Sequence, residues 1–149
     1  MSWNPTLEEL RKFISILTNR QYDKMEDAIL SGKTTVSYTE EERSVMERKL
    51  KTKIEAEEKL YKTAQLNNAG IEAEKNGNVS LAISIYEENI KGESPASHSY
   101  DRLLILYRKD KRYDDELRII KVAIKVFTGI VKNKFQERGQ KVLQLKGKK

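Results

Sequence analysis

The chain has 149 residues, 35% of them charged and 38% hydrophobic, and is long enough to bury one continuous core. It contains no cysteine, which excludes disulfides, thiolate metal sites and cysteine nucleophiles and indicates a reducing compartment. No window reaches the roughly 18 uninterrupted apolar residues of a membrane span, and the N-terminus lacks a secretory pattern. We therefore expect one domain, residues 1–149, that is cytoplasmic and not associated with a membrane.

Positive charge is concentrated near the C-terminus. The net charge is +6 at pH 7, but residues 1–60 hold 11 Lys and Arg against 12 Asp and Glu, a balance of −1. Residues 117–149 hold 10 Lys and Arg against Glu137 alone, a balance of +9. Because basic surfaces attract phosphate backbones, the C-terminal region is a candidate anion-binding surface.

The first 38 residues predict two short helices that cap the rest of the domain. The first is expected to begin at an Asn4 cap with Pro5 in its first turn, and the second to run from about Gln21 to Leu30 and end at Gly32. Apolar residues of the first helix recur at three- and four-residue steps and share one face: Leu7, Leu10, Phe13, Ile14 and Leu17. Residues 31–38 are β-prone but have no other segment to pair with, so they are predicted to form a loop.

A single long helix is predicted from about Thr39 to Lys75. Thr39 and Glu42 have the spacing of a capping box, and neither proline nor glycine interrupts the chain before Gly70. Such a helix has about 36 residues and a length of roughly 54 Å. Its first half has one narrow apolar stripe, made of Met46, Leu50, Ile54 and Tyr61. We expect this stripe to pack on the N-terminal helices of a monomer, and the alternative is the seam of a homodimer.

The spacing of small and apolar residues within residues 66–90 returns 34 residues later. In the first copy these residues are Leu66, Ala69, Gly70, Ala73, Ala82, Tyr86 and Ile90. In the second copy they are Tyr100, Leu103, Leu104, Tyr107, Leu117, Ile120, Ala123 and Ile124. A polar turn separates the two apolar groups within each copy, so each copy predicts a helical hairpin.

Residues 62–127 resemble tetratricopeptide repeats, a family of 34-residue helical hairpins that cross closely at small residues. The first copy has Gly70 and Ala82 at positions where that family has small residues. The second copy departs from the pattern, because Leu104 and Glu116 stand at the corresponding positions. The resemblance implies an all-α fold in which antiparallel helical hairpins stack as a short solenoid with a long central helix.

This architecture assigns a role to each part of the single domain. Residues 1–38 form the N-terminal helical cap, and residues 39–127 supply the long helix and the two hairpins. Residues 128–149 are expected to form a basic C-terminal helix and tail. Caps are needed because two stacked hairpins leave apolar end faces that neighbouring elements must cover.

In tetratricopeptide proteins the first helix of each hairpin lines a concave groove that holds a partner. The resemblance implies a groove formed by Asn67, Ile71, Glu74 and Lys75 of the first copy and by Asp101, Ile105, Arg108 and Lys109 of the second. Family members that clamp a terminal carboxylate have Asn where this chain has Ile71. The resemblance therefore favours a protein or peptide partner without favouring that mode of binding.

The basic C-terminal region offers a rival site. Its candidates for contact with an anion or a nucleic acid are Arg118, Lys121, Lys125 and Lys132. Lysine-rich helix faces attract nucleic-acid backbones through charge. Phe127 and Phe135 are the few aromatic residues nearby that could stack on bases, so a solubilising surface is the competing interpretation.

The sequence contains no recognisable reaction centre. His98 is the only histidine and cysteine is absent, which together exclude a histidine pair for a metal and a Cys–His dyad. Acidic runs at residues 40–42 and 114–116 fall at predicted helix starts, where the helix dipole favours them. No glycine-rich phosphate loop is present. We therefore expect no enzyme, no metal and no cofactor.

The favoured function is that of a non-catalytic adaptor or regulator that binds a protein or peptide in the tetratricopeptide-like groove. One alternative is an accessory protein that binds nucleic acid through the basic C-terminal region. Another is a small inhibitor protein of bacterial or phage origin that blocks a site on its partner.

Overall fold

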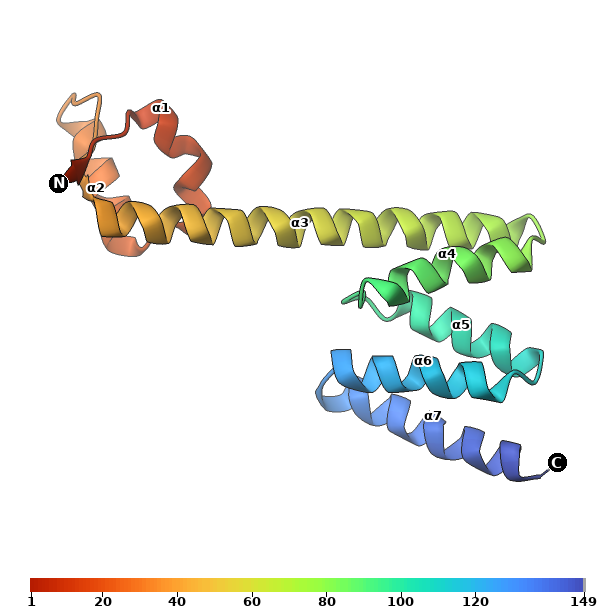
Figure 1. Cartoon of the computed structure of the whole chain (residues 1–149). Helices are drawn as coiled ribbons and strands as arrows, with labels where there is room; N and C mark the ends of the chain where they lie inside the picture. The colour runs from red at the N-terminus through yellow and green to blue at the C-terminus, as the bar shows by residue number, and fades with distance from the viewer. Residues whose placement is uncertain (149) are drawn as a thin grey trace. The chain divides into compact units, whose positions relative to one another are not determined.

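The computed structural model describes residues 1–148 and shows a predominantly helical chain with one very small sheet (Figure 1). The all-α class predicted from the sequence is confirmed. The chain divides into two compact units, Met1–Glu57 and Glu58–Lys149. Helix α3, Glu40–Lys75, contributes to both units and has 36 residues. Its observed bounds confirm the long helix that was predicted.

The first unit consists of short elements and the start of α3. Their bounds are β1 Ser2–Trp3, α1 Leu7–Leu10, the 3-10 helix η1 Arg11–Ile16, α2 Asn19–Leu30 and β2 Tyr38–Thr39. Thr18 caps α2, because its hydroxyl accepts the backbone N–H of Gln21 at 3.2 Å and the Gln21 side chain accepts that of Thr18 at 3.0 Å. The predicted capping box of α3 is confirmed by the same pair of bonds between Thr39 and Glu42, both at 3.0 Å.

The start of the first helix was predicted wrongly. The helix begins at Leu7, because the Thr6 hydroxyl accepts the backbone N–H of Glu9 at 3.1 Å and takes the capping role expected of Asn4. From Arg11 onward the chain continues as a 3-10 helix rather than an α-helix. The change of helix type alters which side chains share a face.

The prediction that residues 31–38 form only a loop is also wrong. Strand β2 ends this segment and pairs antiparallel with β1, which places Trp3 opposite Tyr38. A two-residue strand at the N-terminus has no alternating pattern by which sequence reasoning finds strands. The pairing brings the ring centroids of Trp3 and Tyr38 to 6.0 Å, at the edge of the core.

The core of the first unit contains the beginning of the α3 stripe. Its buried apolar residues are Leu10, Phe13, Met25, Ala28, Val36, Tyr38 and Met46, and Leu50 packs against them. Farther along α3, Ile54 and Tyr61 are 44% and 68% exposed. The prediction that the N-terminal helices cover the whole stripe is therefore wrong beyond Leu50. Ile14, expected on the covering face, is 45% exposed because it lies in the 3-10 segment.

The second unit contains the end of α3 followed by four helices. They are α4 Val79–Lys91, α5 His98–Lys109, α6 Tyr113–Val126 and α7 Gly129–Gly147. Consecutive helices pack on one another from α4 to α7, and the colour gradient from green to blue follows this order (Figure 1). Gly70 of α3 lies against the ring of Tyr86 of α4, where an added β-carbon would overlap the ring. The helices α3 to α6 confirm that each copy of the repeated spacing contains the two predicted helical segments.

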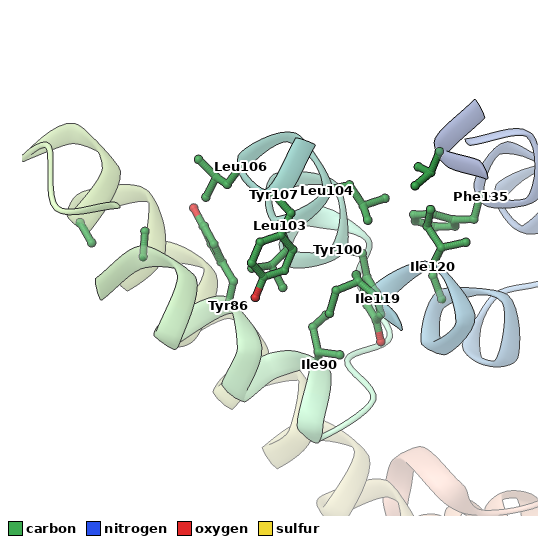
Figure 2. Close-up of a cluster of buried hydrophobic side chains, with 14 residues drawn as sticks. Tyr86, Ile90, Tyr100, Leu103, Leu104, Leu106, Tyr107, Ile119, Ile120 and Phe135 are labelled. Atoms are coloured by element: carbon green, nitrogen blue, oxygen red, sulfur yellow. The ribbon is translucent and has the colours of Figure 1, made fainter. Parts of the chain in front are cut away.

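One continuous apolar cluster joins these helices (Figure 2). The labelled residues come from α4 (Tyr86, Ile90), α5 (Tyr100, Leu103, Leu104, Leu106, Tyr107), α6 (Ile119, Ile120) and α7 (Phe135). Tyr100 places its ring edge-on to two phenylalanines, with centroids 5.2 Å from Phe127 and 6.1 Å from Phe135. The contact with Phe135 holds α7 against α5, and the contact with Phe127 holds the end of α6 there.

Helix α7 buries one narrow face. Phe135, Gly139 and Val142 are buried and lie on one side of the helix. Ile130 and Leu143 of the same helix are apolar but 75% and 58% exposed. The helix therefore contacts the rest of the unit along one stripe and leaves apolar surface uncovered.

Candidate functional site

A groove lies between α5 and α7 and has a volume of about 530 Å³. Its lining residues are Ser97, Asp101, Arg108, Val131, Lys134, Phe135, Glu137, Arg138 and Lys141. Four of these side chains are cationic and two are carboxylates, so the lining has a formal charge of +2. We call this surface the α5–α7 groove.

Two arginines of the α5–α7 groove are oriented by one buried carboxylate. Glu116 of α6 is fully buried and accepts the Nε–H of Arg108 at Oε1 and the Nε–H of Arg138 at Oε2, both at 3.2 Å. Arg108 Nη2 also lies 2.9 Å from Glu116 Oε2, at an angle that is unsuited to a hydrogen bond. The Nη2 atom is buried and has no hydrogen-bond partner in residues 1–148. One carboxylate neutralises only one guanidinium, so the cluster keeps a positive charge beside the groove.

The remaining lining includes two lysines, apolar surface and the carboxylates of Asp101 and Glu137. Lys134 and Lys141 are exposed and form no ion pair within the described chain. Phe135 contributes a largely buried ring, and Val131 is 39% exposed. Apolar contact area with convergent charged groups is the composition expected of a binding surface.

Farther along the unit, a polar cluster ties α3 to α4 and α5. Glu74 accepts hydrogen bonds from Arg102 at 2.5 and 3.0 Å and from the Tyr86 hydroxyl at 2.6 Å. The Arg102 guanidinium holds the pKa of Glu74 below its usual value, while burial and the bond to Glu74 raise the pKa of Tyr86. The ring of His98 lies edge-on to Tyr86 at 5.7 Å, and its Nε2 atom is buried without a hydrogen-bond partner in the described chain.

A second polar cluster lies between the same helices. The Asn89 side-chain amide donates to the Thr63 carbonyl at 3.2 Å, to Asn67 Oδ1 at 3.0 Å and to Ser99 Oγ at 2.9 Å. Ser99 also donates to Asn67 Oδ1 at 2.6 Å. Because buried polar groups are costly unless paired, these bonds stabilise the helix packing and leave little of Asn67 free for a ligand.

The structure separates the eight residues predicted for the groove into three groups. Asp101 and Arg108 line the α5–α7 groove. Asn67 and Glu74 are engaged in the polar clusters between helices. The others lie outside that groove, with Ile71 half-buried and the remaining three exposed: Lys75, Ile105 and Lys109.

Sequence reasoning missed the contribution of α7 to this groove. A signal was available, because the apolar spacing returns once more after 35 residues. Tyr100, Leu104 and Tyr107 of α5 correspond in this way to Phe135, Gly139 and Val142 of α7. The extra residue in the connection hid the third occurrence from a search at period 34.

Two of the four basic residues predicted for the rival site form ion pairs. Arg118 pairs with Glu87 at 2.6 Å, and Lys125 pairs with Glu93 at 2.6 Å. Lys121 and Lys132 form no ion pair within residues 1–148. Two of the four positive charges are thus already offset by carboxylates of the same chain.

Residues 1–148 contain no group of three or more His, Cys, Asp or Glu side chains arranged to hold a metal ion. In the same part of the chain, every helix is too short or too polar to cross a bilayer. Comparison with protein-family models, with curated proteins and with solved structures found no match to this chain.

Proposed function

We propose that the protein is a non-catalytic interaction module that binds an acidic, extended segment of a partner protein in the α5–α7 groove. The observation that carries this proposal is the pair of arginines, Arg108 and Arg138, fixed on the buried Glu116. Their geometry is set before a ligand arrives, so little side-chain entropy is lost when a ligand carboxylate approaches.

The proposal includes a tetratricopeptide-like arrangement of the second unit. Three observations support it: the 34-residue spacing of the two helical hairpins, the close approach of Gly70 to Tyr86, and the consecutive packing of α4 to α7. In this arrangement α5 and α7 are first helices of successive hairpins and lie on the concave side. The groove between them then corresponds to the usual peptide-binding surface of such solenoids.

The charge of the groove favours an acidic ligand. Lys134 and Lys141 add two exposed ammonium groups beside the arginine pair, and Phe135 and Val131 add apolar surface between them. A peptide with carboxylates next to apolar side chains matches both features. Attraction of this kind weakens as salt increases, because exposed charges are screened over about 8 Å at physiological ionic strength.

The proposal is tested with two labelled peptides, one with alternating Glu and Leu and one with Gln in place of every Glu. We expect the Glu peptide to bind and the Gln peptide to bind much more weakly. The double variant Lys134→Gln/Lys141→Gln should lower affinity for the Glu peptide by roughly two- to thirtyfold, as expected for two exposed ionic contacts.

A matched control separates the groove from general charge. Lys75→Gln/Lys109→Gln removes two exposed lysines that do not line the groove, so it should leave the affinity nearly unchanged. Equal affinity for the Glu and Gln peptides, or an equal loss in both double variants, would contradict the proposal. Fluorescence anisotropy at two salt concentrations measures all of these quantities.

The nucleic-acid alternative predicts a different result. The variant Lys121→Gln/Lys125→Gln/Lys132→Gln should leave binding of the Glu peptide intact, because none of these residues lines the α5–α7 groove. Binding to a random DNA duplex should vanish near about 0.15 M salt, since weak contacts to phosphates are lost through counterion release. A duplex complex that persists at that salt concentration and weakens in this variant would favour the alternative.

A further inference from the structure

A second groove lies between α6 and α7 and shares no lining residue with the α5–α7 groove. It has a volume of about 450 Å³ and is lined by Leu117, Ile120, Lys121, Ile124, Gln136, Gly139, Gln140 and Leu143. Leu143 is 58% exposed, and the three aliphatic side chains from α6 form a continuous apolar floor. We call this surface the α6–α7 groove.

The charge around the α6–α7 groove is positive. Lys121 is the only charged residue in its lining and forms no ion pair within the described chain. Residues 58–149 together contain 19 Lys and Arg against 12 Asp and Glu, a balance of +7. A segment that covers the apolar floor is therefore stabilised by carboxylates placed next to Lys121.

Helix α6 combines a buried apolar face with a basic edge that forms ion pairs. Its residues Ile119 and Ile120 are buried in the shared core. At its edge, Arg118 pairs with Glu87 of α4 and Lys125 pairs with Glu93. The basic edge of α6 is thus met by one carboxylate from α4 and one from the connection that follows α4. An amphipathic helix with acidic flanks would repeat this arrangement in the α6–α7 groove.

Helix α2 of the first unit has an exposed face of this kind. Tyr22, Ile29 and Leu30 are 43%, 52% and 78% exposed. Tyr22 and Ile29 are seven residues apart, about 10.5 Å along a helix, which equals the separation of Leu117 and Ile124 along the floor of the groove. The spacing of the exposed apolar side chains on α2 therefore matches the spacing of the apolar side chains on the floor of the groove.

The charges of α2 favour a basic partner by a small excess, because its three carboxylates outnumber its two basic side chains, Arg20 and Lys24. Asp23, Glu26 and Asp27 lie beside the exposed apolar residues and form no ion pair within residues 1–148. Residues 1–57 contain 10 Lys and Arg against 11 Asp and Glu, a balance of −1, in contrast to the basic second unit. Unpaired carboxylates on one surface and an unpaired lysine on the other favour their association.

We propose that α2 of one copy of the chain binds in the α6–α7 groove of a second copy. Tyr22 and Ile29 contact the apolar floor and Leu143, while the α2 carboxylates face Lys121. The two surfaces differ, so the contact is heterologous and each copy has one of each surface. This self-association is independent of ligand binding in the α5–α7 groove.

The test measures self-association of the full chain by sedimentation velocity over a wide concentration series. Leu143→Glu in the groove and Ile29→Lys on α2 should each weaken self-association by roughly tenfold or more, as expected for central residues of an interface. Ile130→Glu changes another exposed residue of α7 that lines neither groove, and self-association should be unchanged. All three positions are on the surface, and circular dichroism checks that each variant retains its helix content.

Mixing the variants makes the test specific for a heterologous contact. The Leu143→Glu chain retains an intact α2 and the Ile29→Lys chain an intact groove, so an equimolar mixture should form a one-to-one complex that neither variant forms alone. A wild-type chain that stays monomeric at every concentration would overturn the proposal. So would a mixture that fails to associate, or a loss of self-association in Ile130→Glu equal to that in Leu143→Glu.

Discussion

The two helical hairpins of the second unit have the same spacing but fill the contact between their helices differently. In the α3–α4 hairpin, Gly70 lies against the Tyr86 ring and Ala82 is fully buried. At the corresponding positions 34 residues later, the α5–α6 hairpin has Leu104 and Glu116, both also fully buried.

The difference shows how a departure from a packing pattern places charged side chains beside a groove. A buried carboxylate is tolerated in the second hairpin because Arg108 and Arg138 neutralise it. The same arginines line the α5–α7 groove. In the first hairpin the position corresponding to Arg108 is Glu74, so that position offers no arginine to neutralise a buried carboxylate. Four substitutions test this comparison.

The largest effect should come from placing the carboxylate of the second hairpin in the first. Ala82→Glu buries a carboxylate in the first hairpin, where Glu74 occupies the position that corresponds to Arg108. Because no arginine at that position neutralises the new charge, the variant should lower the free energy of unfolding by about 4 kcal/mol or more. Ala69→Glu introduces the same side chain at an exposed position of α3 and should cost little. Urea unfolding of both variants measures the difference, and similar midpoints would show that the hairpins differ less than proposed.

Overpacking the first hairpin should have the next largest effect. Gly70→Leu forces a side chain into the ring of Tyr86 and should cost about 1–3 kcal/mol. Gly92→Leu is the matched control, because the nearest atom to an added β-carbon there is a backbone oxygen at 3.7 Å. A thermal midpoint of Gly70→Leu equal to that of the wild type would place the helix contact elsewhere.

The buried amide of the first hairpin provides a smaller test. Asn89→Ala removes the donor that joins Thr63, Asn67 and Ser99 and should cost about 1–2 kcal/mol, because Ser99 and Asn67 still bond to each other. Asn68→Ala at an exposed position is the control. A fully tolerated Asn89→Ala would mean that the polar cluster adds nothing to stability.

The smallest effect concerns pH. The pKa of Glu74 is held below its usual 4.5 by Arg102, so its contribution is present above pH 4.5 and is lost as the pH falls through the lower folded value. Glu74→Gln should therefore be less stable than the wild type by about 1 kcal/mol at neutral pH. The gap should narrow in acid. A gap that stays constant from pH 7 to pH 3 would contradict the ion-pair explanation.

Periodicity predicted the helices of the second unit well, because long helices repeat the same apolar spacing over several turns. The capping box at Thr39 and the absence of helix breakers predicted α3, and the repeated apolar spacing predicted the helices from α4 to α6. In the first unit, the helix start at Leu7 and the pairing of β1 with β2 depend on single hydrogen bonds and a two-residue strand. Such short elements produce no period in the sequence.

The candidate site was predicted only in part, for a physical reason. Asp101 and Arg108 were found from the resemblance to a known repeat, whereas Arg138 belongs to a helix whose spacing is shifted by one residue. Glu116 reads in the sequence as an acidic residue near a helix start, which the helix dipole explains. Its full burial and its two arginine partners depend on tertiary packing.

The most direct test of the central claim is a two-dimensional ¹H–¹⁵N spectrum of the full chain titrated with the Glu–Leu peptide. We expect saturable shifts of backbone amides near Asp101 and Arg108 of α5 and near Lys134 and Arg138 of α7, with no comparable shifts for the Gln–Leu peptide. Shifts confined to other helices, or no shifts at peptide concentrations that saturate the anisotropy signal, would contradict the assignment of the α5–α7 groove as the binding site.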